Sequence, residues 1–175
     1  FVIKRAIHTT ADFDYADNLV FSENAAAKGI EALRSGCDIV TDTQMAKSGI
    51  NKTILEKLGG TVHCFMSDAD VASEAKQRGI TRAYVSMERA AKLPKPCIFA
   101  IGNAPTALIA LHDMLEKGGI APALIIGVPV GFVNVVESKE LIIGSDVPHI
   151  VARGRKGGSN VAAAICNALL YQIMR

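Results

Sequence analysis

The sequence lacks the features that would place it in a membrane or mark a metal site. No apolar run approaches the roughly 20 residues that a membrane-spanning helix needs. The four cysteines, at positions 37, 64, 97 and 166, form no C-x-x-C pair, and no H-E-x-x-H motif occurs. These absences argue against a zinc site and favour reduced thiols that pack as small apolar side chains. We therefore expect a cytoplasmic protein with no membrane partner, metal or cofactor.

No charge of one sign dominates the chain. Nineteen Lys and Arg residues oppose 17 Asp and Glu residues, which gives a formal net charge of +2. Dedicated nucleic-acid binders usually gather their basic residues into a dominant stripe or tail, and this balance is too mild for that. We expect no nucleic-acid partner.

The motifs of three common enzyme classes are also missing. The sequence contains no G-x-G-x-x-G fingerprint, no Gly-Lys-Ser/Thr P-loop and no G-x-S-x-G nucleophile elbow. A dinucleotide-binding enzyme, a P-loop nucleotidase and a serine hydrolase of the elbow type therefore have no specific support.

What is present is an alternation of apolar strand patterns and helical patterns. The chain has 175 residues, half of them hydrophobic, which is enough for one domain over residues 1–175 with a core covered on both faces. Strands separated by helices pair in parallel through right-handed crossovers. We therefore predict an α/β fold, a three-layer α/β/α sandwich with a central, mostly parallel sheet. The expected strands are 39–41, 61–65, 98–101, 124–126 and 150–152, and the expected helices are 12–21, 22–34, 43–47, 51–58, 68–78, 81–92, 105–117, 135–142 and 159–174.

Three of these strands run directly into loops of small residues. The loops span residues 102–106, 127–131 and 153–159. In open α/β sheets, ligands bind beyond the carboxyl ends of the strands, where loops and helix N-termini converge. Three such loops in one chain predict a crevice for one large ligand.

The last of these loops has the chemistry of an anion site. Arg153, Arg155 and Lys156 flank glycines just before a helix that Ser159 opens, and the free N–H groups of a helix start carry partial positive charge. Phosphate and carboxylate groups would bind these cations and N–H groups equally well, so a phosphate-dependent α/β enzyme is one interpretation. The alternative is a solvated helix start.

Among the four histidines, His8 stands out. It lies in a junction rich in hydroxyl groups and close to Asp12 and Asp14, where an imidazole can be oriented for proton transfer. The alternative is a structural histidine beside an ordinary helix cap. His63 falls in an expected strand, His112 in the middle of an expected helix and His149 just after Pro148, and we expect structural roles for all three.

Several separate blocks of sequence carry a family resemblance across essentially the whole chain. They are residues 7–13, 39–42 with Met45, 79–83, 102–108, 127–133 with 137–139, and 153–159. With these blocks, the chain resembles the precorrin-8X methylmutase family, also called cobalt-precorrin-8 methylmutase or precorrin isomerase, of cobalamin biosynthesis.

The resemblance implies an isomerase that moves a methyl group from C11 to C12 of a corrinoid ring without an external methyl donor. The product would be hydrogenobyrinate or its cobalt form, cobyrinate. His8 takes the family's catalytic position, where it would exchange a proton with the macrocycle. Arg82 would bind a carboxylate of the ring's acidic side chains. Asp42 would orient His8 or cap the following helix.

The resemblance and the loop chemistry together give a set of expected substrate-binding residues. They are Thr9, Thr10, Asp42, Thr81, Arg82, Asn103, Thr106, Arg153, Arg155, Gly157, Gly158 and Ser159. For Asn103 and Thr106, a cap or turn role is the alternative.

The resemblance also implies a homodimer. Family members usually carry an N-terminal segment ahead of the histidine block, and we expect it to be missing from this chain. A non-catalytic corrinoid-binding or carrier protein of the same fold is the alternative function.

Overall fold

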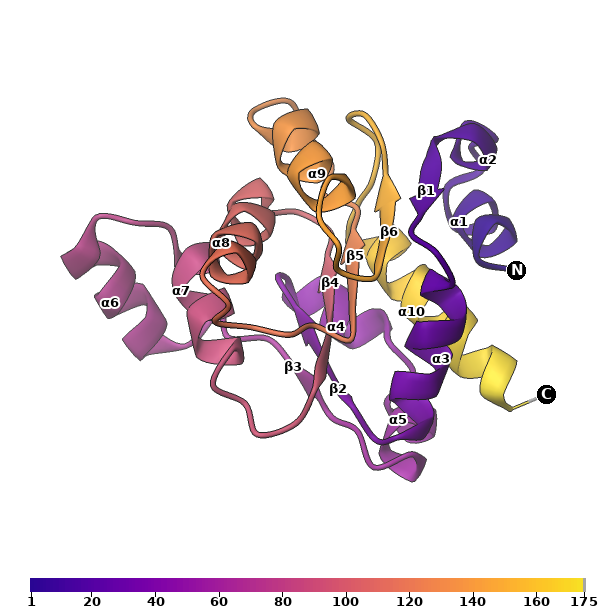
Figure 1. The fold of residues 1–175 in the computed structure, drawn as a ribbon, viewed down its shortest axis with the longest axis horizontal. Helices are drawn as coiled ribbons and strands as arrows, with labels where there is room; N and C mark the ends of the chain where they lie inside the picture. Colours follow the sequence, from indigo (N-terminus) through magenta and orange to yellow (C-terminus); the bar gives the residue numbers. More distant parts are fainter. Residues whose placement is uncertain (175) are drawn as a thin grey trace.

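The computed structural model describes residues 1–174 and centres on one six-stranded sheet (Figure 1). The strand order is β1-β6-β5-β4-β2-β3. All neighbouring pairs are parallel except β1 with β6, which is antiparallel. The predicted mostly parallel α/β sheet is thus confirmed. The strands are β1 (Leu19–Phe21), β2 (Asp38–Thr41), β3 (Val62–His63), β4 (Cys97–Ile101), β5 (Leu124–Gly127) and β6 (His149–Ala152).

Helices cover both faces of this sheet, as the three-layer prediction requires. The helices α1, α3, α4, α5 and α10 pack on one face, and α7, α8 and α9 pack on the other, with α6 outside α7 (Figure 1). The helices are α1 (Val2–Thr10), α2 (Tyr15–Asn18), α3 (Ala25–Arg34), α4 (Gln44–Gly49), α5 (Lys52–Lys57), α6 (Ala69–Arg78), α7 (Arg82–Ala90), α8 (Pro105–Glu116), α9 (Val135–Ile143) and α10 (Ser159–Ile173).

The central strands are continuous apolar runs because both of their faces are covered. Successive side chains of a strand point to opposite faces of the sheet. Ile39 and Ile98 therefore pack under α10 and its neighbours, while Val40 and Phe99 pack under α7 and α8. Every residue of β2, β4, β5 and β6 is buried, which is the pattern of parallel strands enclosed by helices.

The N-terminal region differs from the prediction of a helix over residues 12–21, of which only Tyr15–Asn18 is helical. The first helix is instead α1, which buries Val2 and Ala6 against α10 and ends at Ala11 in the left-handed conformation. A single turn, α2, follows, and β1 then pairs with the edge of β6, with Val20 opposite Val151. Residues 19–21 form a strand because they pair with the edge of β6. This pairing joins residues far apart in the chain, so local sequence patterns do not predict it.

The order of the strands locates the topological switch point of the sheet. From β2 the chain moves to β3 at one edge, whereas from β4 it moves through β5 and β6 toward the other edge. The direction of winding thus reverses between β2 and β4. In open α/β sheets, ligands bind at this switch point, outside the carboxyl ends of the strands.

Candidate active site

Asp42 stands at the switch point, directly after β2. Its carboxylate accepts hydrogen bonds from the backbone N–H groups of Gly102 and Asn103, both at 2.8 Å, and of Ala104 at 2.6 Å. Burial raises the pKa of Asp42, and the three N–H donors, which favour the ionised form, oppose that effect.

This placement corrects our expectation for Asp42. The side chain is 1% exposed and neither orients His8 nor caps the helix that follows it, because both of its oxygens bind the loop after β4. The cap of α4 is Thr43, whose hydroxyl accepts the N–H of Ala46 at 3.1 Å. Asp42 therefore fixes the loop after β4 from the buried side of that loop and does not face a ligand.

The loops after β2, β4 and β6 are locked together at the same edge of the sheet. Thr43 Oγ1 and Ser159 Oγ share a hydrogen bond of 2.7 Å. A Cβ atom on Gly102 would lie 2.7 Å from the Cα of Ser159, so only glycine allows the start of α10 to approach this closely.

The loops after β5 and β6 meet in the same way. Gly158 donates its backbone N–H to the carbonyl of Val128 at 2.9 Å, and Gly131 donates to the carbonyl of Arg155 at 3.2 Å. A Cβ atom on Gly157 would lie only 2.1 Å from the carbonyl oxygen of Val128. The structure thus brings the three predicted loops together at one edge of the sheet, where the crevice is predicted.

Two of the three cations of the 153–159 loop already have carboxylate partners. Arg153 binds Glu140 through two hydrogen bonds, of 2.9 and 3.3 Å. Lys156 reaches Asp12 at 2.6 Å and Asp14 at 2.5 Å, and these carboxylates raise its pKa. In this structure Arg153 is therefore paired with Glu140, and its binding of a substrate anion stays a prediction.

Arg155 differs from its two neighbours. Within residues 1–174 its guanidinium has no carboxylate partner, and it lies 6.0 Å from the centroid of the Phe132 ring, which is 84% exposed. A cation beside an exposed aromatic ring suits a ligand that combines an apolar plane with carboxylates.

Sequence reasoning missed the part played by Lys139. This side chain is fully buried on α9 and donates to the carbonyls of Gly154 at 2.7 Å and Lys156 at 2.8 Å. Burial lowers its pKa to about 8. The available signal was a lysine one turn before Ile142, on the buried side of α9.

His8 lies in the last turn of α1, not in a loop junction as expected, and it is exposed. It lines a hollow between α1 and α10 together with Arg5 and Tyr171. The carbonyl of the next residue, Thr9, accepts the side-chain amide of Asn160 at 3.5 Å.

The hydroxyl of Thr10 is used at the end of the same helix. It donates to the carbonyl of Ala6 at 2.8 Å and accepts the backbone N–H of Asp12 at 3.2 Å. Thr10 therefore shapes the turn that carries Asp12 toward Lys156.

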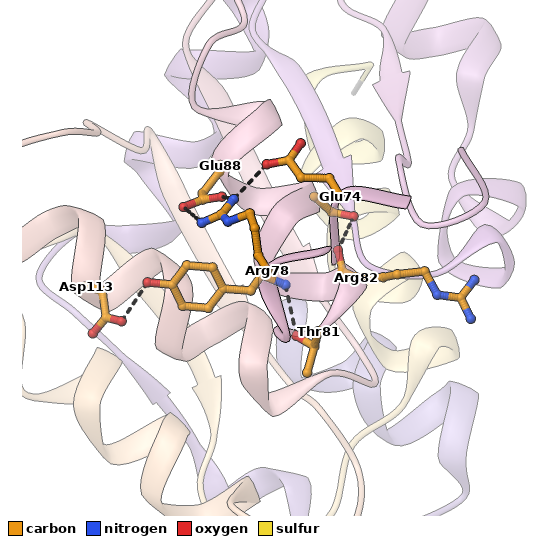
Figure 2. Close-up of polar contacts among 8 residues, drawn as sticks. Glu74, Arg78, Thr81, Arg82, Glu88 and Asp113 are labelled. Atoms are coloured by element: carbon orange, nitrogen blue, oxygen red, sulfur yellow. Dashed lines mark hydrogen bonds and ion pairs between the residues drawn. The ribbon is translucent and has the colours of Figure 1, made fainter. Parts of the chain in front are cut away.

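The start of α7 supplies a further cation. Thr81 caps the helix by accepting the N–H of Tyr84 at 3.1 Å, and its hydroxyl donates to Thr106 Oγ1 at 3.1 Å. Figure 2 shows the guanidinium of Arg82 pointing away from the cluster in which Arg78 binds glutamates. The guanidinium of Arg82 has no hydrogen bond or ion pair to any described residue, so it is available to a ligand.

The remaining predicted residue, Asn103, has an exposed side chain at the start of the loop that Asp42 holds. Over the described range 1–174, no group of three metal-ligating side chains occurs. Within the same range, no helix has the length and apolarity to cross a membrane.

Comparison with known proteins gives one consistent result. The family described as precorrin-8X methylmutase (CbiC) matches residues 1–172. The cobalt-precorrin-8 methylmutase of Salmonella typhimurium is 50% identical over 175 residues, which cover 98% of this chain and 80% of that protein. The precorrin-8X methylmutase of Pseudomonas aeruginosa is 41% identical over 167 residues, which cover 94% of this chain and 80% of that protein. The crystal structure of the Thermus thermophilus precorrin-8x methyl mutase has a TM-score of 0.90 at 36% identity, covering 99% of this chain and 85% of that one.

Proposed function

Because the chain belongs to the precorrin-8X methylmutase family, we propose that it is a corrinoid isomerase of cobalamin biosynthesis. It moves a methyl group from C11 to C12 of precorrin-8X or cobalt-precorrin-8. The observation that carries the proposal is the convergence of the loops after β2, β4, β5 and β6 at the switch point, beside two arginines that have no carboxylate partner among the described residues. A broad apolar ring with acetate and propionate groups at its edge fits such a surface.

The edge of the ring is bound by two cations that lack carboxylate partners among residues 1–174. Arg82 and Arg155 present planar guanidinium groups, which bind carboxylates through two parallel hydrogen bonds. The apolar face of the ring packs on Val130 and Phe132, which are 47% and 84% exposed. Thr9, Thr81, Asn103, Thr106 and Ser159 contribute polar groups around this surface.

His8 is the catalytic residue in this proposal. The methyl shift breaks the bond to C11 and forms the bond to C12 within one molecule, so no external donor or acceptor is required. The imidazole exchanges a proton with the ring, which favours the tautomer in which the methyl group migrates. The exposure of His8 on α1 supports this role because a ligand can reach the imidazole.

Replacing His8 with alanine tests the proposal. General acid–base catalysis typically contributes about 10²–10⁴-fold, so we expect His8→Ala to lose turnover by that order while it still binds hydrogenobyrinate. Turnover of the substrate is followed by absorbance, and binding of the product by an absorbance titration. His112→Ala, on α8 in the opposite helical layer, is the matched control.

The outcomes separate the candidate functions. Equal turnover by His8→Ala and the unchanged protein contradicts the role of His8. Saturable corrinoid binding without turnover by the unchanged protein identifies the carrier alternative. Tight nucleotide binding without corrinoid binding identifies the phosphate-dependent enzyme. Comparing kcat/KM for the metal-free and cobalt substrates decides which form is physiological.

We propose further that the protein is a single-domain, cytoplasmic homodimer. One sheet joins β1 near the N-terminus to the later strands, which supports a single domain. The four free, buried cysteines support a reducing compartment. Phe13 and Val133 are both 78% exposed, which supports a surface that a second copy covers.

A further inference from the structure

We propose that Lys139 is a positioning residue that sets the 153–158 loop in the conformation that binds substrate carboxylates. The side chain comes from α9, which packs beside β6, and its ammonium group bridges the carbonyls of Gly154 and Lys156. These two residues flank Arg155, the cation of the loop without a carboxylate partner among the described residues. The identity of the ligand rests on the proposed function.

Because of the geometry of the peptide unit, these two contacts also fix the direction of two N–H groups of the loop. In a trans peptide the C=O and the following N–H point in opposite directions. Because the carbonyls of Gly154 and Lys156 point at Lys139, the N–H groups of Arg155 and Gly157 point away from it. Neither N–H group has an acceptor among residues 1–174. Two N–H groups on the same side of the loop present partial positive charge, which favours an anion beside the guanidinium of Arg155.

The intervening carbonyl completes the pattern. Arg155 C=O, which lies between the two contacts, accepts the N–H of Gly131 from the loop after β5. The side chain from α9 therefore binds the carbonyls of Gly154 and Lys156, and the loop after β5 binds the carbonyl of Arg155 between them. Lys139 is the side chain that fixes two of these three carbonyls, and the guanidinium of Arg155 extends from the same segment.

The cost of burying Lys139 argues for a role beyond packing. A lysine ammonium is almost never fully buried without a carboxylate, yet no ion pair of Lys139 occurs among the described residues. A methionine of similar length would fill the same space without that cost. The distinguishing property of lysine here is its ability to donate to two carbonyls at once.

The test compares Lys139→Met with Lys139→Gln, which keeps an N–H donor on a side chain one atom shorter. Lys28→Met, at an exposed position on α3, is the matched control. For Lys139→Met we expect the Kd for hydrogenobyrinate and the KM for substrate to rise about tenfold, as for one lost hydrogen bond to a charged group. The kcat should change little, because uniform binding is lost. For Lys139→Gln we expect a Kd and a KM between those of the unchanged protein and those of Lys139→Met.

A second measurement needs no corrinoid. Trypsin cleaves after Arg153, Arg155 and Lys156, so we expect it to cut Lys139→Met in this loop faster than the unchanged protein or Lys28→Met. If the unchanged protein neither binds nor converts corrinoid, the proposed function fails, and the cleavage rates still decide whether Lys139 holds the loop. Unchanged KM and unchanged cleavage in both Lys139 variants overturn the proposal. If Lys139→Met does not fold, the Lys139→Gln results alone decide it by the same criteria.

Discussion

At the scale of single residues, two buried charges shape this crevice through backbone contacts. Asp42 is 1% exposed and Lys139 is fully buried, and among the described residues neither has an oppositely charged side chain as partner. Asp42 accepts three backbone N–H groups, whereas Lys139 donates to two carbonyls. Each side chain therefore fixes a loop that follows a different strand.

The binding role proposed for Arg82 predicts a difference between arginine and lysine at this position. Arg82→Lys keeps the charge but removes the planar fork that binds a carboxylate in two places. We expect KM to rise about tenfold, the effect of losing one hydrogen bond to a charged group, with kcat nearly unchanged. Steady-state kinetics measure both constants. Arg34→Lys, at an exposed position on α3, should leave them unaltered; an unchanged KM for Arg82→Lys would count against the contact.

The buried ammonium of Lys139 predicts a dependence of stability on pH. Its pKa is about 8 in the folded protein against an ordinary value of 10.5, so between these values the unfolded chain binds more protons. The contribution of this group to the free energy of unfolding therefore rises with pH from about 8 to 10.5.

Urea unfolding of the protein and of Lys139→Met at pH 7 and pH 10 measures this contribution. The unchanged protein should gain on the order of 2 kcal/mol relative to the variant on going to pH 10. The variant serves as the reference because all other groups titrate in both proteins. A difference between the two that stays constant with pH would show that the ammonium is not destabilised by burial.

At the scale of elements, the crevice depends on how closely the loops after β5 and β6 approach each other. We expect Gly157→Ala to destabilise the protein by about 1–3 kcal/mol, as for overpacking at a tight contact. The added Cβ would lie 2.1 Å from the carbonyl oxygen of Val128, so the two loops must separate.

Thermal unfolding and a hydrogenobyrinate titration measure the two consequences of Gly157→Ala, a lower Tm and weaker binding. Gly119→Ala is the control because the nearest atom to its added Cβ lies 3.5 Å away, an ordinary contact. Equal stability and affinity in both variants would mean that the loops adjust to the added methyl group without separating.

At the scale of the whole molecule, the exposed apolar side chains beside the crevice predict self-association. Size-exclusion chromatography with light scattering should give a mass about twice the 18.5 kDa of one chain. Val133→Asp places a charge at a 78% exposed position and should shift the protein toward the monomer. Leu141→Asp, at a 39% exposed position on α9, should not. A monomeric unchanged protein would contradict the dimer.

Sequence alone determined the layered architecture of this protein. The apolar runs 98–101 and 124–126 indicated strands covered on both faces, and the helices between strands indicated parallel pairing; both predictions are confirmed. Pro105 at the start of α8 and Gly118 after its end mark that helix because their backbone preferences are local. The family was also recognisable, because its blocks follow one another in order along the chain.

Tertiary structure decided the contacts between residues distant in the chain. It placed His8 on a helix and made residues 19–21 a strand on the edge of β6. It also paired Lys156 with Asp14, 142 residues away, which leaves Arg155 as the available cation of its loop among the described residues. Local patterns report propensity and periodicity, but they do not report which carboxylate will lie next to which cation. Folding brings such partners together, and in this protein it decided which of the expected anion-binding groups are free.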